Sequence, residues 1–116
     1  MRVDEIATTV EGEIVLFSEK ADKIAESLML GAISPESAVN YFQRKSGKAV
    51  IIAGDRPDIQ LAALETSTAC LVITDGQKPR PIVRARAEDQ GVPLIVTALG
   101  TMQAVEKLEA VFGVKK

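Results

Sequence analysis

The sequence predicts an α/β protein of three layers, in which helices cover both faces of a mostly parallel sheet. Three segments, at residues 49–53, 69–74 and 92–97, are rich in Val, Ile and Leu and show little alternation with polar residues. Such runs are typical of strands that are buried on both faces. Each run is followed by a segment with helical spacing, and this alternation indicates parallel pairing with right-handed crossovers. We expect one domain over residues 1–116, because a chain of 116 residues is too short for two.

Composition excludes several functional classes. Hydrophobic residues make up 47% of the chain and aromatic residues only 3%, so the core must be aliphatic. The net charge of −2 argues against binding to nucleic acid or to anionic membranes. The absence of histidine removes the commonest general base and metal ligand. We therefore expect no metal and no cofactor, and a cytoplasmic location fits the single cysteine and the acidic N-terminus.

The first third of the chain is less regular than the rest. Spacing predicts a helix over residues 3–10 that stops near Gly12, and then a strand at residues 14–17. Residues 21–30 fit either a helix or a strand, and we favour a strand at 26–31. A helix then begins at Ser34-Pro35, where Ser34 is a suitable N-cap and proline suits the first helical position.

The remaining helices follow the three buried strands. They are expected at residues 57–66, at residues 80–90, and from Gly100-Thr101 to near the end of the chain. Gly91 is expected to end the second of them in a left-handed conformation. For the helix that starts at Pro57, we expect Asp55 to be the cap and Arg56 to lie near Thr74 or Asp75.

The carboxyl ends of the three buried strands predict the place of a functional site. Ligands of open α/β sheets bind at this edge, and exposed helix N-termini together with a guanidinium favour an anion. The alternative interpretation is structural, with Asp55 as a cap and Arg56 in an ion pair. The residues that the edge gathers are Gly54, Asp55, Arg56, Thr74, Asp75, Gly76 and Thr97.

Other chemically active residues have simpler explanations. Cys70 lies in an apolar run and is expected to be core. Arg80, Arg84 and Arg86 are followed by acidic residues, which favours a solvated face of mixed charge. Lys48 and the glycine before it precede a strand, so they do not form a phosphate-binding loop that opens a helix.

The segment GDRPDIQLAALETSTACLVITDG resembles a DRTGG domain, a family named for a Gly-Asp-Arg turn and a later Thr-Gly-Gly turn. Gly54 to Arg56 match the first turn, and Thr74 and Gly76 match the second, where Asp75 replaces a glycine. The flanks GAISPESAVNYF and GVPLIVTALGTMQAVEKL are also similar, and the resemblance adds Thr101 to the candidate site. Such domains resemble the N-terminal domain of HPr kinase/phosphorylase, and they accompany CBS domains in regulated pyrophosphatases and occur in phosphotransacetylase-type proteins.

The resemblance implies an accessory module that is not an enzyme. We expect a regulatory or ligand-sensing domain that binds a small anionic metabolite or a nucleotide. The alternatives are a dimerisation or protein-interaction scaffold without a ligand, and an enzyme that uses Asp55, Arg56 and Asp75. We also expect a homodimer. A small chain buries a limited fraction of its surface, so a chain this rich in aliphatic residues should leave some apolar surface exposed. The candidate interface is the segment Ser27 to Ser34, SLMLGAIS.

Overall fold

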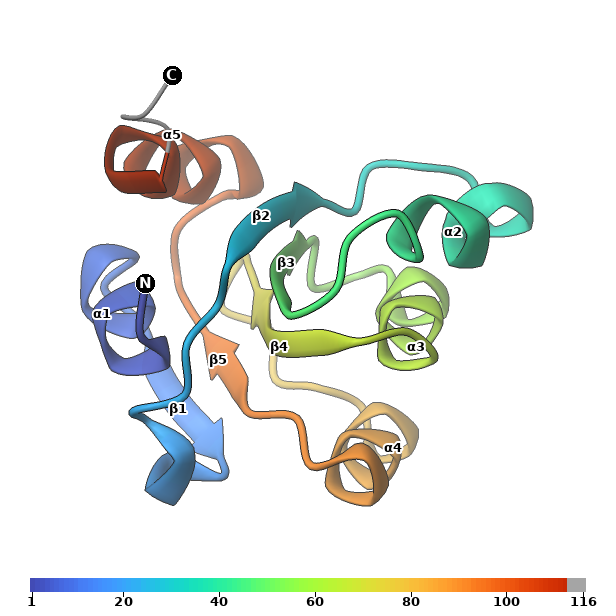
Figure 1. Ribbon diagram of the computed structural model, residues 1–116, viewed down its shortest axis with the longest axis horizontal. Helices are drawn as coiled ribbons and strands as arrows, with labels where there is room; N and C mark the ends of the chain where they lie inside the picture. Colours follow the sequence, from blue (N-terminus) through green and yellow to red (C-terminus); the bar gives the residue numbers. More distant parts are fainter. Residues whose placement is uncertain (113–116) are drawn as a thin grey trace.

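The computed structural model describes residues 1–112 of the chain. Helices and strands follow one another in an order close to the predicted one (Figure 1). The elements are α1 (Val3–Thr9), β1 (Glu13–Leu16), the 3₁₀ turn η1 (Ser18–Lys20), β2 (Ser27–Leu30), α2 (Pro35–Phe42), β3 (Lys48–Ile52), α3 (Pro57–Leu64), β4 (Thr68–Ile73), α4 (Pro81–Gln90), β5 (Leu94–Val96) and α5 (Thr101–Phe112).

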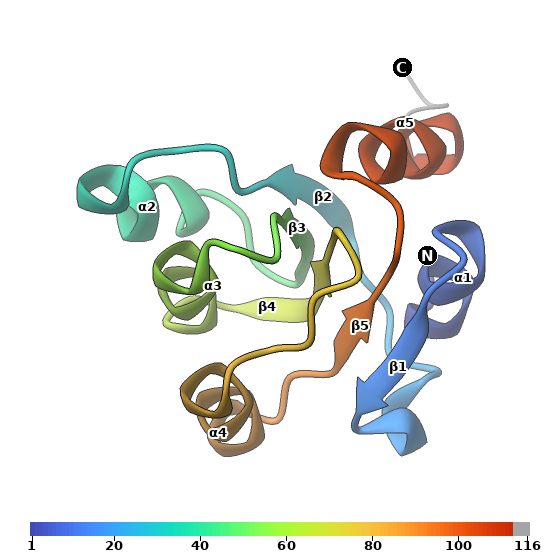
Figure 2. The same ribbon diagram turned by 180° about the vertical axis from the view of Figure 1, so that it is seen from behind.

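A single five-stranded sheet with the order β1-β5-β4-β3-β2 forms the middle layer. β2, β3, β4 and β5 are parallel to their neighbours, and β1 pairs with β5 in the antiparallel direction. Helices α1 and α5 lie on one face, and α2, α3 and α4 lie on the other, as both views of the ribbon show (Figures 1 and 2). This arrangement confirms the predicted three-layer α/β fold with a mostly parallel sheet.

Two aliphatic cores fill the space between the layers. Every residue of β3 and β4 is buried, which explains why these strands show continuous apolar runs. Alternate side chains point to opposite faces of a strand. Ile51 and Val72 therefore join the core under α1 and α5, whereas Ile52 and Ile73 join the core under α2, α3 and α4.

Proline begins three of the helices. Pro35, Pro57 and Pro81 stand in the first turn of α2, α3 and α4, where the missing N–H group would have no partner inside the helix. Gly91 ends α4 with a φ of 70°, which confirms the predicted left-handed terminus.

The ambiguous segment at residues 21–30 ends in a strand. Leu28 and Met29 of β2 pair with Ala49 and Val50 of β3, so contact with the sheet decides what local spacing left open. No helix among residues 1–112 combines the length and the apolar character that crossing a membrane requires.

Candidate functional site

The three buried strands end together at one edge of the sheet, as the sequence predicts. β3, β4 and β5 are neighbours and run in the same direction, so their carboxyl ends lie together. Backbone hydrogen bonds extend the ladder past the strands, because Thr74 N–H donates to the Ile52 carbonyl (3.2 Å) and Thr97 N–H donates to the Ile73 carbonyl (3.0 Å). The turns that follow β3, β4 and β5 therefore start at one level.

Gly54 is required by close packing. A Cβ atom at this position would lie 2.5 Å from the carbonyl oxygen of Thr74 and 2.7 Å from the Cβ of Gln77. Both distances are shorter than real side chains allow, so the turn after β3 can approach the turn after β4 only without a side chain. The glycine thus holds two of the candidate turns together.

The predicted cap of α3 by Asp55 is wrong, and Arg56 has a partner that the sequence reasoning did not name. Arg56, not Asp55, is the N-cap residue of α3, and no side chain caps the helix. Asp55 is exposed, and the Nε of Arg56 donates to Oδ1 of Asp58 at 3.4 Å rather than to Thr74 or Asp75. The cause is local: Asp58 lies in the first turn of α3, two residues from Arg56, and also accepts a hydrogen bond from the N–H of Ile59 (2.9 Å).

A hydrogen-bonded cluster joins β4 to the start of α5. Thr74 is buried, and its hydroxyl lies 2.8 Å from the Thr101 hydroxyl and 3.2 Å from Oδ2 of Asp75. Asp75 has a φ of 66° and adopts the left-handed conformation that a glycine would favour, which aspartate tolerates better than most residues. Thr74, Asp75 and Thr101 are thus brought together.

The turns after β4 and β5 are tied by backbone hydrogen bonds. Asp75 N–H donates to the Leu99 carbonyl and Gly76 N–H donates to the Thr97 carbonyl, both at 2.8 Å. The hydroxyl of Thr97 is buried and donates to the carbonyl of Val10 at 2.6 Å, while it accepts from Leu99 N–H at 3.1 Å. Thr97 therefore fixes the end of β5 and does not face open solvent.

A cavity of about 600 Å³ opens beside this edge. It lies between the end of β5, the beginning of β1 and the loop that leads into α4. Its walls are partly aliphatic and it carries two cations. The lining residues are Glu13, Val15, Gly76, Lys78, Pro79, Arg84 and Val96.

A β-bulge places one of these cations. Ile14 pairs with Ile95 and Leu16 pairs with Leu94, so Val15 has no partner of its own in β5. The carbonyl of Val15 accepts a hydrogen bond from Nη1 of Arg84 at 3.1 Å. The bulge therefore orients an arginine of α4 at the cavity and leaves its other N–H donors available.

Sequence reasoning did not single out Lys78 and Arg84, the two cations that line the cavity. Lys78 follows the predicted Thr-Asp-Gly turn by two positions, so the turn itself was a usable signal. Arg84 was expected on a solvated face, and it is exposed, but the bulge that gives it a partner cannot be seen in the sequence.

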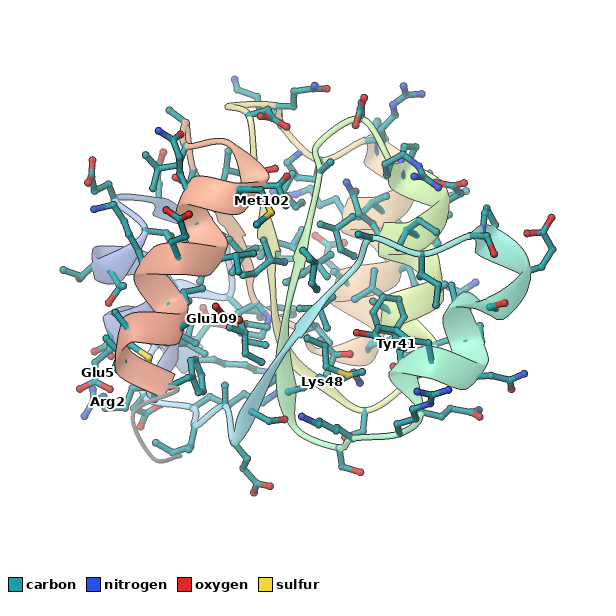
Figure 3. All side chains as sticks on the ribbon, turned by 90° about the horizontal axis from the view of Figure 1, so that it is seen from above. Arg2, Glu5, Tyr41, Lys48, Met102 and Glu109 are labelled. Carbon is teal, nitrogen blue, oxygen red and sulfur yellow. The ribbon has the colours of Figure 1, made fainter. Side chains whose placement is uncertain are left out.

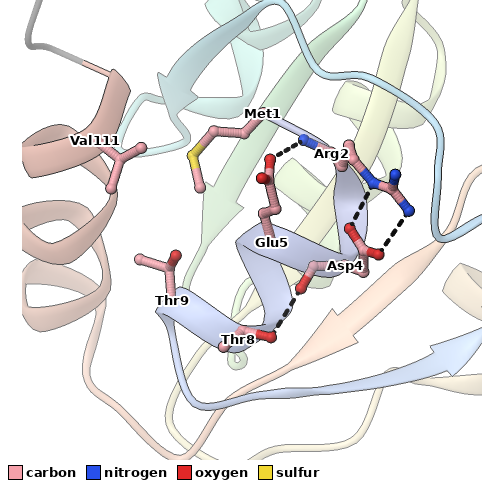
Figure 4. A pocket seen from close by; sticks show the side chains of 7 residues that line it. All are labelled: Met1, Arg2, Asp4, Glu5, Thr8, Thr9 and Val111. Atoms are coloured by element: carbon pink, nitrogen blue, oxygen red, sulfur yellow. Dashed lines mark hydrogen bonds and ion pairs between the residues drawn. The ribbon is translucent and has the colours of Figure 1, made fainter.

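A second cavity, of about 560 Å³, lies between α1 and α5 (Figure 4). Its polar side chains are engaged with one another. Both nitrogens Nε and Nη2 of Arg2 donate to Asp4, at 3.1 and 2.9 Å, and Glu5 accepts from the backbone N–H of Arg2 at 2.8 Å. Glu5 thus satisfies a backbone N–H at the start of α1 and Arg2 pairs with Asp4 in its first turn, so the charges here are explained by the helix end.

Lys48 is a buried cation at the start of β3, at the end of the strand opposite to the candidate site (Figure 3). Its Nζ donates to the hydroxyls of Thr66 (2.9 Å) and Thr68 (3.2 Å) and to the carbonyl of Ser67. Both hydroxyls in turn donate to the carbonyl of Ala63, near the end of α3. Burial lowers the pKa of Lys48 to about 8.

Two further observations concern Cys70 and possible metal ligands. Cys70 is fully buried, and burial raises the pKa of its thiol to about 12, so it is a core residue and not a nucleophile. Within residues 1–112, no group of three or more Cys, Asp or Glu side chains is arranged to hold a metal ion.

Comparison with known proteins assigns the family. The model of the DRTGG domain matches residues 5–111. Among solved structures, the fold is similar to the CBS and DRTGG domains of the regulatory region of Clostridium perfringens pyrophosphatase, complexed with the activator diadenosine tetraphosphate. The TM-score is 0.77 and the identity is 21%, over 92% of this chain and 45% of that one, so this chain spans less than half the length of that relative. Because the family model covers nearly the whole sequence, the chain belongs to the DRTGG domain family.

Proposed function

We propose that the chain is a non-catalytic regulatory module that binds a small anionic metabolite or a nucleotide at the carboxyl ends of the sheet strands. The observation that carries this proposal is the cavity beside Gly76, which contains the cations Lys78 and Arg84. Ligand sites of open α/β sheets lie at this edge, and pockets of several hundred Å³ suit small organic ligands.

The lining of the cavity supports an anionic ligand with an apolar part. Arg84 uses one donor on Val15 and keeps a planar set of others for a carboxylate or phosphate, and Lys78 adds a second positive charge. Val15, Pro79 and Val96 offer apolar contact to an organic group. Glu13 places one negative charge on the rim, which favours a ligand that also carries an amino group.

The predicted site residues contribute to this proposal in different ways. The Asp75-Gly76 turn borders the cavity. The Thr74 hydroxyl bonds to Asp75 and to the Thr101 hydroxyl, and these contacts support the turn. Gly54 and Thr97 position the neighbouring turns. Asp55 and Arg56 stand at the same edge, where Arg56 can exchange Asp58 for a ligand because both side chains of that ion pair are partly exposed.

The known neighbour supports a ligand-sensing role. Its regulatory region contains a DRTGG domain and was determined with a nucleotide activator. This supports the proposal that a module of this family receives a nucleotide signal. The enzyme alternative requires Asp55, Arg56 and Asp75 to converge on one substrate, whereas Arg56 pairs with Asp58 instead.

A thermal-shift series tests the proposal. Wild type is heated with inorganic phosphate, small carboxylates and adenine nucleotides, and a ligand at about 100-fold its Kd should stabilise the fold by roughly 2.7 kcal/mol. The double variant Lys78→Ala, Arg84→Ala should lose the shift and keep its fold. Arg44→Ala, an exposed cation beside Tyr41, is the matched control. Arg56→Ala measures how much the turn at Gly54–Arg56 contributes to the thermal shift.

Two results would contradict the proposal. One is the absence of a shift with every compound in the series. The other is a shift that survives in the double variant and in Arg56→Ala, because the anion would then bind at a different place.

A second proposal concerns assembly. We propose a homodimer through the segment Ser27 to Ser34, which contains the edge strand β2 and apolar residues that are only partly buried. The scaffold alternative shares this surface and differs only in having no ligand. We further propose a cytoplasmic setting without nucleic-acid or membrane partners, on the basis of the charge and the single buried cysteine.

A further inference from the structure

The bulge of β1 turns two successive side chains to the same face of the sheet. Ile14 packs against the core under α1 and α5, whereas Val15 and Leu16 both pack against the core under α2, α3 and α4. In a regular strand, neighbours in the sequence face opposite sides, so this arrangement is a product of the bulge. β1 therefore brings an aliphatic, partly buried wall to the cavity beside α4.

The charged groups of this cavity come from different elements and do not neutralise one another. Lys78 precedes α4 and Arg84 belongs to it, while Glu13 is an exposed residue of β1. The ion pairs found within residues 1–112 include none of the three. Arg84 donates instead to the neutral carbonyl of Val15 at 3.1 Å. The carboxylate of Glu13 thus keeps both oxygens as acceptors for a ligand.

We propose that the ligand of this cavity is a guanine nucleotide, whose phosphate binds to Lys78 and Arg84 and whose base donates to Glu13. This inference rests on the anion site proposed above and names the class of its ligand. The cations bind one end of the nucleotide and the carboxylate binds the other, so the cavity selects for both ends.

The two cations match a phosphate better than a carboxylate. A phosphomonoester carries a charge of about −1.5 to −2 at neutral pH, whereas a carboxylate carries a single negative charge. The Arg84 guanidinium has further donors in one plane, and such a set binds two phosphate oxygens at once. Lys78 adds a compact second charge from the loop before α4. A phosphate therefore uses both cations.

Glu13 distinguishes guanine from the other bases. A carboxylate only accepts hydrogen bonds, and its two oxygens suit two donors that lie side by side. Guanine offers such a pair, namely its N1–H group and its 2-amino group. Adenine places an acceptor nitrogen beside its amino group, which a carboxylate repels, and hypoxanthine lacks the amino group. The carboxylate on the β1 side of the cavity therefore favours guanine.

The aliphatic lining and the size of the cavity suit a planar base. Val15 of β1, Pro79 before α4 and Val96 of β5 line it together with the charged groups. Apolar side chains contact the faces of a ring without competing for its polar edge. The volume of about 600 Å³ lies within the range of roughly 300–1,000 Å³ that is typical of sites for small organic ligands. A mononucleotide is a ligand of this size.

Glu13 also has a simpler structural explanation. Charged residues on an edge strand discourage pairing with other chains, and Glu13 stands at the start of the edge strand β1. That explanation predicts no influence of Glu13 on nucleotide binding. A variant of this residue therefore separates the two explanations.

Calorimetric titration tests the class of ligand. Wild type is titrated with GMP, IMP, AMP and guanosine. GMP should bind about tenfold more tightly than IMP or AMP, because each of these lacks a hydrogen bond to a charged group. Guanosine, which has no phosphate, should bind far more weakly than GMP.

Glu13→Gln tests the residue that recognises the base. The glutamine keeps the size of the side chain and replaces one acceptor oxygen by a donor, so the preference for GMP over AMP should disappear. Glu19→Gln, which removes the same charge from an exposed residue outside the cavity, should keep the preference. Circular dichroism and urea unfolding verify that both variants are folded.

The outcomes separate this inference from the function proposed above. A wild type that binds neither inorganic phosphate nor any of the nucleotides overturns both. Equal or tighter binding of AMP, lost in the double variant Lys78→Ala, Arg84→Ala, overturns the guanine nucleotide and leaves the anion site standing. A preference for GMP that persists in Glu13→Gln overturns the contact between the base and Glu13.

Discussion

Gly54 shows how a single missing side chain determines the geometry of the site. Gly54→Ala should lower the free energy of unfolding by about 1–3 kcal/mol, because its Cβ would press on the carbonyl of Thr74. Urea unfolding measures the loss. Gly100→Ala is the matched control, since its Cβ would meet its nearest neighbour, Oε1 of Gln103, at 3.5 Å. Equal losses in the two variants would show that close packing at Gly54 is not the cause.

Lys48 should make stability depend on alkaline pH. Its pKa is about 8 in the fold and has an ordinary value of 10.5, so the unfolded chain binds more protons between these values. The free energy of unfolding should therefore rise with pH over this range, by up to about 3 kcal/mol.

Variants isolate the contribution of Lys48. Lys48→Met should flatten this rise in urea titrations carried out from pH 8 to 10.5. Lys45→Met, which removes an exposed lysine close by, should leave it unchanged. A wild type and a Lys48→Met variant with parallel pH profiles would contradict the assignment.

Among single residues, sequence and structure agree best where conformation is local. Gly91 was predicted from its place after a helix, and Cys70 from its apolar neighbours. The partners of Arg56 and Lys48 were not predictable, because Asp58 competes within one helical turn and the three acceptors of Lys48 lie 18–20 positions along the chain. Pairing of polar groups depends on distances that only the fold supplies.

At the scale of elements, one hydrogen bond between hydroxyls links β4 to α5. Thr101→Val should cost about 1 kcal/mol of unfolding free energy, because the buried Thr74 hydroxyl loses its Thr101 partner. Thr101→Ser keeps the hydroxyl and should lose less. Chemical denaturation of both variants measures the difference, and an equally stable valine variant would show that the contact is not stabilising.

Elements with strong local signals were predicted and those defined by contacts were not. Prolines at the start of α2, α3 and α4 made the beginnings of these helices predictable from the sequence. Residues 21–30 were ambiguous because Ala21, Ile24, Ala25 and Leu28 also fit helical spacing, and the pairing of β2 with β3 decides it. The bulge at Val15 leaves no trace in the sequence, and it positions the arginine of the candidate site.

At the scale of the whole molecule, access to Cys70 should require global opening. The thiol is fully buried in the central strand and its pKa is raised to about 12, so a thiol reagent should react only with the unfolded chain. Labelling at neutral pH should follow the urea unfolding curve. Rapid labelling in native buffer would show that the centre of the sheet opens locally.

The layered fold was predictable because buried strands and helices alternate along most of the chain, and the family was predictable from the resemblance of the turns at Gly54–Arg56 and Thr74–Gly76. The antiparallel β1 was not specified by that pattern, and neither was the order of the five strands. The cavity beside Gly76 joins β1, β5 and α4, so it depends on both. Sequence motifs located the edge of the sheet correctly, while the cations at the cavity came from segments outside the motifs.

The bulge at Val15 also has a consequence for polymer growth. A fibre built by strand addition needs two receptive edges in every subunit, one for each neighbour in the row. β1 is closed to such addition by its irregular register and by the Arg84 guanidinium, which occupies the Val15 carbonyl. A homodimer built through β2, as proposed above, therefore ends at two chains, and the same irregularity that orients Arg84 keeps a sheet with one open edge from propagating into fibrils.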